Sequence, residues 1–155
     1  MPTVLFVCTA NQCRSPMAEV IGRQLLATHY PEVEWRVGSA GVRAGNGYPA
    51  TPASATVAGR HGFDLSRHSS RALTQQIVEE CDLLVTMEVA HKRAILRQFP
   101  DAAGRVFVLG ELNGRSEDVD DPIGLPLVEY ERTYDLLEAW IEASLPRIAR
   151  LTGAV

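Results

Sequence analysis

The chain has 155 residues, of which 46% are hydrophobic, and a net charge of −4. This length supports one core, so we expect a single domain over residues 1–155 and no second domain. The charge and the lack of a polybasic run argue against nucleic-acid and membrane partners, and no apolar stretch approaches the ~20 residues of a membrane span. Three cysteines are an odd set for a secreted fold and the first residues lack a basic leader, so we expect a cytoplasmic protein.

Apolar runs and helical periodicities alternate along the chain. The expected strands cover about residues 3–7, 33–39, 83–87 and 105–109. The expected helices cover about residues 15–30, 51–61, 73–80, 90–99 and 127–151. A glycine-rich loop over residues 41–49 is expected to line the mouth of a site, and an acidic loop over 113–124 precedes the last helix. Strands separated by helices predict an α/β fold, with a four-stranded parallel sheet flanked by helices.

The turn after the first strand carries the strongest functional signal. The strand delivers Cys8 into a short loop that ends at Arg14, and Ser15-Pro16 begins a helix with proline in its favoured first turn. Ligands of open α/β sheets bind at the carboxyl ends of the strands, and a helix N-terminus offers free N–H groups to an anion. We therefore expect this loop to bind an oxyanion through a set of consecutive residues: Thr9, Ala10, Asn11, Gln12, Cys13, Arg14 and Ser15.

Cys8 and Arg14 together indicate phosphoryl transfer. Amide N–H groups, a helix dipole and a guanidinium favour a thiolate at Cys8, and such a thiolate under a bound phosphate can attack phosphorus to form a phosphocysteine. The arginine fork can hold two phosphate oxygens. The leaving group needs a proton, and Asp121 is the candidate donor because Pro122 restricts its backbone, with Asp120 and Asp118 as alternatives.

These residues resemble the low-molecular-weight protein tyrosine phosphatases. The resemblance extends over nearly the whole chain and is carried by matching pieces: the Cys-x5-Arg-Ser-Pro loop, Ser39-Ala40-Gly41, His61-Gly62 with His68 and Arg71, residues 82–88, and Asp121-Pro122. It implies Cys8 as nucleophile, Arg14 as phosphate clamp, and Asp121 as general acid and then base. It also implies that Ser15 hydrogen-bonds the sulfur and that Asn11, Ser39 and His68 form a network that shapes the loop.

Three departures from the family pattern concern the loop and the substrate. The family usually has glycine at Ala10, which matters if that residue needs a positive φ angle. Gln12 stands where tyrosine phosphatases have a branched apolar residue and bacterial phosphoarginine phosphatases have threonine. The tyrosines that often follow Asp-Pro are replaced by Ile123-Gly124-Leu125. The expected substrate is a phosphotyrosyl protein, with protein phosphoarginine as the alternative, and no oligomeric state is assigned.

The remaining cysteines and histidines have weaker signals. Cys13 is either a packing residue or a redox partner that traps oxidised Cys8 as a disulfide. Cys81 is expected in the core, and His29, His61 and His91 at the surface or as helix caps. We expect neither metal nor cofactor, since no cysteine and histidine spacing suits zinc. An arsenate reductase would need further downstream cysteines, and a cysteine phosphocarrier would not need Arg14 or Asp121.

Overall fold

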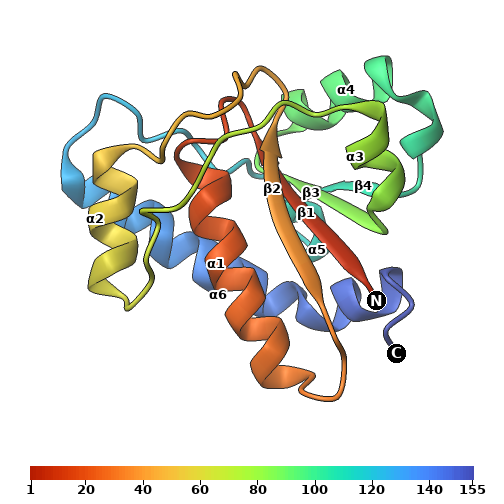
Figure 1. Cartoon of the computed structure of the whole chain (residues 1–155). Coiled ribbons are helices and arrows are strands. Elements are labelled where there is room, and N and C mark those ends of the chain that lie inside the picture. The colour runs from red at the N-terminus through yellow and green to blue at the C-terminus, as the bar shows by residue number, and fades with distance from the viewer.

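The computed structural model describes all residues, 1–155, and has a four-stranded parallel sheet at its centre (Figure 1). The strands lie in the order β2-β1-β3-β4, with bounds β1 Thr3–Cys8, β2 Arg36–Gly41, β3 Leu83–Thr86 and β4 Val106–Val108. The helices are α1 Arg14–His29, α2 Pro52–Arg60, α3 Gln75–Glu80, α4 Val89–Gln98, α5 Leu109–Leu112 and α6 Leu127–Leu151, with a 3-10 turn η1 at Pro100–Ala102. The expected α/β sheet is confirmed.

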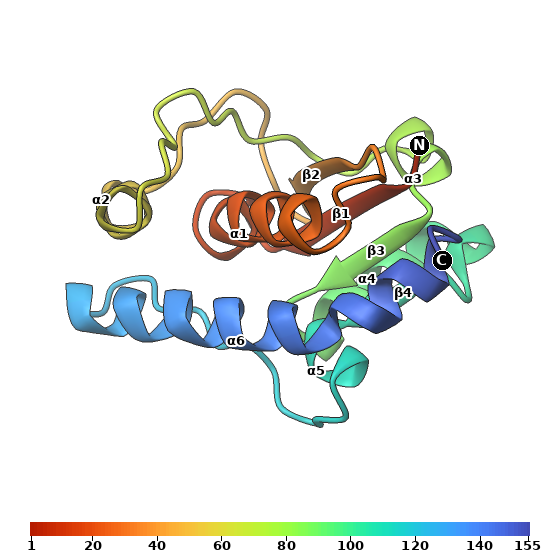
Figure 2. The same cartoon turned by 90° about the horizontal axis from the view of Figure 1, so that it is seen from below.

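The central strand β1 is buried on both faces, which explains its uninterrupted apolar sequence. Val4 and Phe6 face a cluster that includes residues of α1 and α6, whereas Leu5 and Val7 face one that includes residues of α3 and α4. This alternation follows the two-residue period of a strand. The sheet is therefore a middle layer between two helical layers, as the second view shows (Figure 2).

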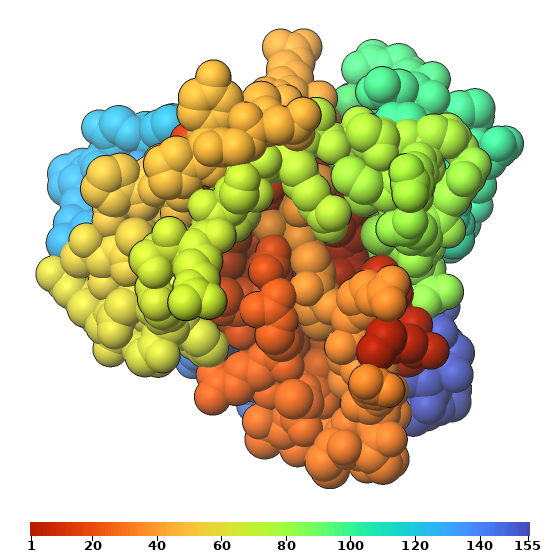
Figure 3. Space-filling view, in the orientation of Figure 1, coloured from red at the N-terminus to blue at the C-terminus, as the bar shows by residue number.

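The segment between α2 and α3 crosses one face of the molecule in front of α1 and β2 (Figure 3). Gly62 lies near its start, and its φ of +88° suits glycine at a helix end. It continues through His68 and Arg71, and Ala72 forms an isolated bridge with Gly41 at the end of β2. The segment thereby reaches the carboxyl ends of the strands, where β1 leads into α1.

Several element bounds differ from the expected ones. β2 begins at Arg36 rather than residue 33, because its ladder with β1 starts where Arg36 pairs with Thr3. α3 begins at Gln75 rather than residue 73, because the Thr74 side chain caps the helix by accepting from the Ile77 N–H. Two short elements were not expected, η1 and α5. None of the helices has the length and apolar character that crossing a bilayer requires.

Candidate active site

The loop between β1 and α1 forms the centre of the candidate site. It leaves the sheet at Cys8 and enters the helix at Arg14, and Asn11 turns the chain with a φ of 58°. Asn11 is the only non-glycine residue with a positive φ, so Ala10 needs no glycine-like backbone. Gly41 lies against the loop, where a Cβ atom would come within 2.5 Å of the Thr9 carbonyl oxygen.

The Cys8 sulfur lies 3.0 Å from the Ser15 hydroxyl oxygen, at the end of β1. Ser15 accepts a hydrogen bond from Asn11 Nδ2 at 2.8 Å. An amide nitrogen can only donate, so the Ser15 proton is left free to point at the sulfur. The geometry therefore supplies a hydroxyl donor to Cys8, as the family resemblance implies.

Asn11 is fully buried, and hydrogen bonds hold both its side chain and its backbone. Its Nδ2 also donates to Ser39 Oγ at 2.9 Å, and its Oδ1 accepts from the Arg71 N–H at 3.0 Å. His68 Nε2 donates to the Asn11 carbonyl at 2.7 Å. The structure thus brings Asn11, Ser39 and His68 together as expected, and these bonds hold the left-handed residue in place.

The Arg14 side chain is almost completely buried and anchored from two distant segments. Its Nη1 donates to Glu88 Oε2 and, at 2.7 Å, to the Val119 carbonyl oxygen. Its Nε has no hydrogen-bond partner although it is buried. A buried donor without a partner is costly, and an oxyanion held in the loop could satisfy it. Glu88 was not singled out from the sequence, because it lies 74 residues away from Arg14.

Asp121 is the acidic residue of the 113–124 loop that reaches this site. Its Oδ2 lies 3.7 Å from Arg14 Nη2, and its Oδ1 accepts from the Ile123 N–H at 3.1 Å. Asp118 instead accepts from the Val89 N–H at the start of α4, and Asp120 lies outside the pocket lining. The geometry favours Asp121 over both alternatives.

One pocket gathers the expected residues. Its lining consists of Cys8, Thr9, Ala10, Gln12, Cys13, Arg14, Thr51, Asp121 and Ile123. Asn11 and Ser15 are fully buried behind it. The prediction that residues 41–49 line the mouth is not confirmed, because none of them is among these lining residues, although the loop contacts two residues that are. Gln12 Nε2 donates to the Pro49 carbonyl at 3.0 Å, and the Arg43 N–H donates to the Thr9 carbonyl at 2.9 Å.

His91 is a further residue at the site that sequence reasoning did not place there. Its Nδ1 accepts from the Glu88 N–H at 3.1 Å, so Nε2 carries the proton and donates to Thr9 Oγ1 at 2.9 Å. Burial and then the Arg14 charge lower the pKa of His91 to about 4. The expected capping role is confirmed, whereas a surface position is wrong because the residue is 3% exposed. Its only sequence signal is the capping spacing from Glu88 to His91.

Comparisons with known proteins agree with this geometry. The family model for "Low molecular weight phosphotyrosine protein phosphatase" matches residues 3–152. The chain belongs to this family. It is 40% identical over 149 residues, covering 96% of this chain and 97% of its relative, to the "Probable low molecular weight protein-tyrosine-phosphatase EpsP" of Ralstonia solanacearum.

Some of the proteins to which this chain is similar are named as arginine phosphatases. A "Protein-arginine-phosphatase" of Bacillus subtilis is 38% identical over 136 residues, covering 87% of this chain and 89% of that protein. A structure of a Cys-to-Ser mutant of the YwlE arginine phosphatase, with a phosphorylated active site serine, has a TM-score of 0.89 at 33% identity. It covers 96% of this chain and 99% of that one.

The other two cysteines of this family member are buried free thiols. Burial raises the pKa of Cys13 to about 12 and that of Cys81 to about 11. Cys81 lies in the apolar cluster that Leu5 and Val7 face, whereas Cys8 and Cys13 belong to the other cluster. The expected core position of Cys81 is confirmed.

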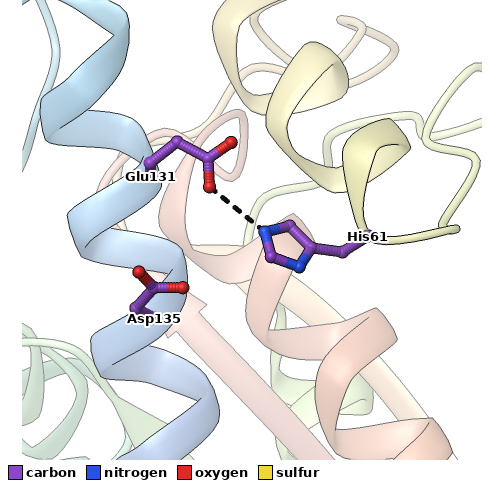
Figure 4. Close-up of side chains that lie close together, drawn as sticks. All are labelled: His61, Glu131 and Asp135. Atoms are coloured by element: carbon purple, nitrogen blue, oxygen red, sulfur yellow. Dashed lines mark hydrogen bonds and ion pairs between the residues drawn. The ribbon is translucent and has the colours of Figure 1, made fainter.

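A second cluster of titratable groups lies away from the pocket, where α2 ends beside α6. It consists of His61, Glu131 and Asp135, whose ligand atoms lie within 4.8 Å of one another (Figure 4). Glu131 already accepts from Arg60 at 3.2 Å and His61 at 3.1 Å, and the His61 ring stacks on Tyr134. These contacts make the cluster a network of one ion pair and one hydrogen bond that joins the two helices.

Proposed function

We propose that this protein is a phosphatase that hydrolyses phosphotyrosine on proteins through a phosphocysteine at Cys8. The observation that carries the proposal is the convergence of three groups in one pocket: the Cys8 sulfur, the Arg14 guanidinium and the Asp121 carboxyl. They supply a nucleophile, a cation and a proton donor, so the chain itself provides every group that the chemistry needs.

The first half-reaction transfers the phosphoryl group to the enzyme. The Cys8 thiolate attacks phosphorus while the bond between phosphorus and the tyrosyl oxygen breaks, and protonated Asp121 gives its proton to the leaving oxygen. Loop amides and Arg14 Nε, which is otherwise unpartnered, stabilise the charge on the equatorial oxygens. Glu88 and the Val119 carbonyl fix the guanidinium beforehand, so little reorganisation is needed.

The second half-reaction releases inorganic phosphate. Asp121, now ionised, takes a proton from a water molecule, which attacks phosphorus as the sulfur–phosphorus bond breaks. Cys8 leaves as a thiolate stabilised by the Ser15 hydroxyl at 3.0 Å. The related mutant structure with a phosphorylated active site serine supports a covalent step at this position in the family.

The substrate proposal rests on the relatives and on the pocket rim. The family model that matches residues 3–152 describes phosphotyrosine protein phosphatases, and the tyrosine phosphatase relative is 40% identical to this chain. Ile123 on the rim is 62% exposed and offers apolar surface to an aromatic ring. Matched peptides that carry phosphotyrosine or phosphoarginine test the choice, and a higher kcat/KM on the phosphoarginyl peptide would reverse it.

Two substitutions test the catalytic roles. Cys8→Ser should abolish turnover of a phosphotyrosyl peptide, and Asp121→Asn should slow it by about 10²-fold or more, since general acid catalysis typically contributes that much. Asp120→Asn is the matched control and should turn over like the wild type. Activity that survives Cys8→Ser would overturn the proposal. If Asp120→Asn slowed turnover and Asp121→Asn did not, the general acid would be Asp120.

The redox role of Cys13 and the cytoplasmic location stay predictions. The raised pKa of Cys13 keeps its thiol protonated at neutral pH, so its attack on an oxidised Cys8 would be slow. Mass spectrometry of the peroxide-treated protein separates the two roles of Cys13: a redox partner forms a disulfide with Cys8, whereas a packing residue leaves Cys8 oxidised without one. An arsenate reductase relay through Cys81 is not supported, because that cysteine lies in the other core cluster.

A further inference from the structure

A second hollow adjoins the catalytic pocket and is not used by the proposed chemistry. It has a volume of about 220 Å³ and shares Thr9 with the catalytic pocket. One wall is the chain that continues β2, where the Arg43 N–H bonds the Thr9 carbonyl. The other wall is α4, where Ala90, Ala94 and Arg97 follow the spacing of one helix face. The small alanines leave room between the walls.

The charged side chains that line this hollow carry a net positive charge. Arg43 and Arg97 are exposed, and neither side chain takes part in an ion pair or hydrogen bond. Glu88 also lines the hollow, but its carboxylate is already bound to Arg14. His91 is uncharged near neutral pH because its pKa is lowered. Two free guanidinium groups therefore face the hollow in a chain whose net charge is −4.

We propose that this hollow binds an acidic side chain of the substrate protein, close in sequence to the phosphorylated residue. The inference rests on the proposed phosphatase function and adds a preference for acidic flanking sequence. A guanidinium fork matches the geometry of a carboxylate, and two of them can hold one such group from opposite walls.

The position of the hollow suits a residue that flanks the reacting one. Thr9 lines both spaces, so the hollow lies next to the loop that would hold the phosphate of the substrate. Adjacent residues of an extended peptide advance by up to ~3.5 Å each and alternate in direction. A glutamate near the phosphorylated residue can therefore enter the hollow while the phosphate stays under Arg14.

The test compares two phosphotyrosyl peptides that differ only in flanking charge, one with Glu and Asp on both sides and one with Gln and Asn instead. The measured quantity is the ratio of kcat/KM for the acidic peptide to that for the neutral peptide. The test variant is R43Q/R97Q. The control is R36Q/R93Q, which removes two exposed, unpaired arginines that do not line the hollow and so changes the net charge equally.

We expect the kcat/KM of the wild type to be about three- to tenfold higher for the acidic peptide. Two partly exposed ion pairs contribute a binding free energy that corresponds to this ratio. The ratio should fall to about one in R43Q/R97Q and persist in R36Q/R93Q. Equal use of both peptides by the wild type, an unchanged ratio in R43Q/R97Q, or an equal fall in the control would overturn the subsite. The phosphatase proposal itself fails on a different result, activity that survives Cys8→Ser, so the two failures are distinguishable.

Discussion

At the scale of single residues, the direction of each hydrogen bond decides what the site can do. Asn11 Nδ2 donates hydrogen bonds to both Ser15 and Ser39. The Ser39 hydroxyl in turn donates to Glu19 Oε1 at 2.6 Å. Each hydroxyl therefore has one proton with a defined acceptor, and for Ser15 that acceptor is the Cys8 sulfur. The network orients a donor at the one atom that gains and loses charge in the proposed reaction.

Ser15→Ala removes this donor without changing the charge of the site. A hydrogen bond to a charged group contributes about 1.5–3 kcal/mol, so kcat on a phosphotyrosyl peptide should fall by about tenfold or more. Ser144→Ala is the matched control, since Ser144 is equally buried and bonds only the Trp140 carbonyl. An unchanged kcat in Ser15→Ala would show that the hydroxyl does not act on the sulfur.

The local part of the site could be predicted from the sequence, and the distant part could not. Cys8, Arg14 and Ser15 belong to one strand-to-helix turn, whose spacing and proline indicate their chemistry directly. His91 reaches Thr9 across 82 residues, and only the folded sheet brings these two side chains together. Nothing in the residues around His91 distinguishes it from an ordinary helix cap.

At the scale of elements, the length of a helix decides whether its periodicity can be recognised. The strands were expected from their apolar runs, and the longer helices from a periodicity that extends over several residues. α5 has four residues and η1 has three, which is too short for a periodic signal. The glycine-rich loop was expected at the pocket mouth because glycines often approach ligands. In the fold, Gly41 permits close approach to the phosphate loop, where a Cβ atom would meet the Thr9 carbonyl oxygen.

The network around Glu131 predicts a measurable link between α2 and α6. Glu131→Gln should lower the free energy of unfolding by about 1 kcal/mol, or the melting temperature by about 2–4 °C, because the ion pair with Arg60 and the hydrogen bond with His61 both weaken. Thermal unfolding at neutral pH measures the change. Glu142→Gln is the control, since Glu142 is exposed on the same helix and is not ion-paired.

The pH dependence of this link has a definite sign. The hydrogen bond from His61, followed by that from Arg60, lowers the pKa of Glu131 below its ordinary 4.5. The stabilisation is present above that value and is lost as the pH falls through the lowered pKa. The difference between wild type and Glu131→Gln should therefore vanish in acid. A difference that persists there would assign the effect to packing.

At the scale of the whole molecule, two core clusters on opposite faces of one sheet hold the strand ends that carry the site. The buried imidazole of His91 couples the stability of this arrangement to pH. Its pKa is lowered from 6.5 to about 4 by burial and by Arg14, against the opposing charges of Glu88, Asp118 and Asp121. The unfolded chain then binds one more proton than the folded chain between these values.

The free energy of unfolding should therefore fall as the pH decreases from about 6.5 to about 4. Urea unfolding of the wild type and His91→Gln at pH values across this window measures the effect. The variant should be less stable at neutral pH and lose less stability in acid. His29→Gln, which changes an exposed histidine, should follow the wild type. Parallel pH curves for wild type and His91→Gln would contradict the assignment.

The most direct test of the proposed function is to trap the covalent intermediate. Asp121→Asn also removes the base of the second half-reaction, so rapid acid quenching of this variant with a phosphotyrosyl peptide should leave part of the enzyme phosphorylated. Mass spectrometry of the digested protein should then find one phosphoryl group, on the peptide that contains Cys8. A phosphoryl group on another residue, or phosphate release with no labelled enzyme at any quench time, would contradict catalysis through Cys8.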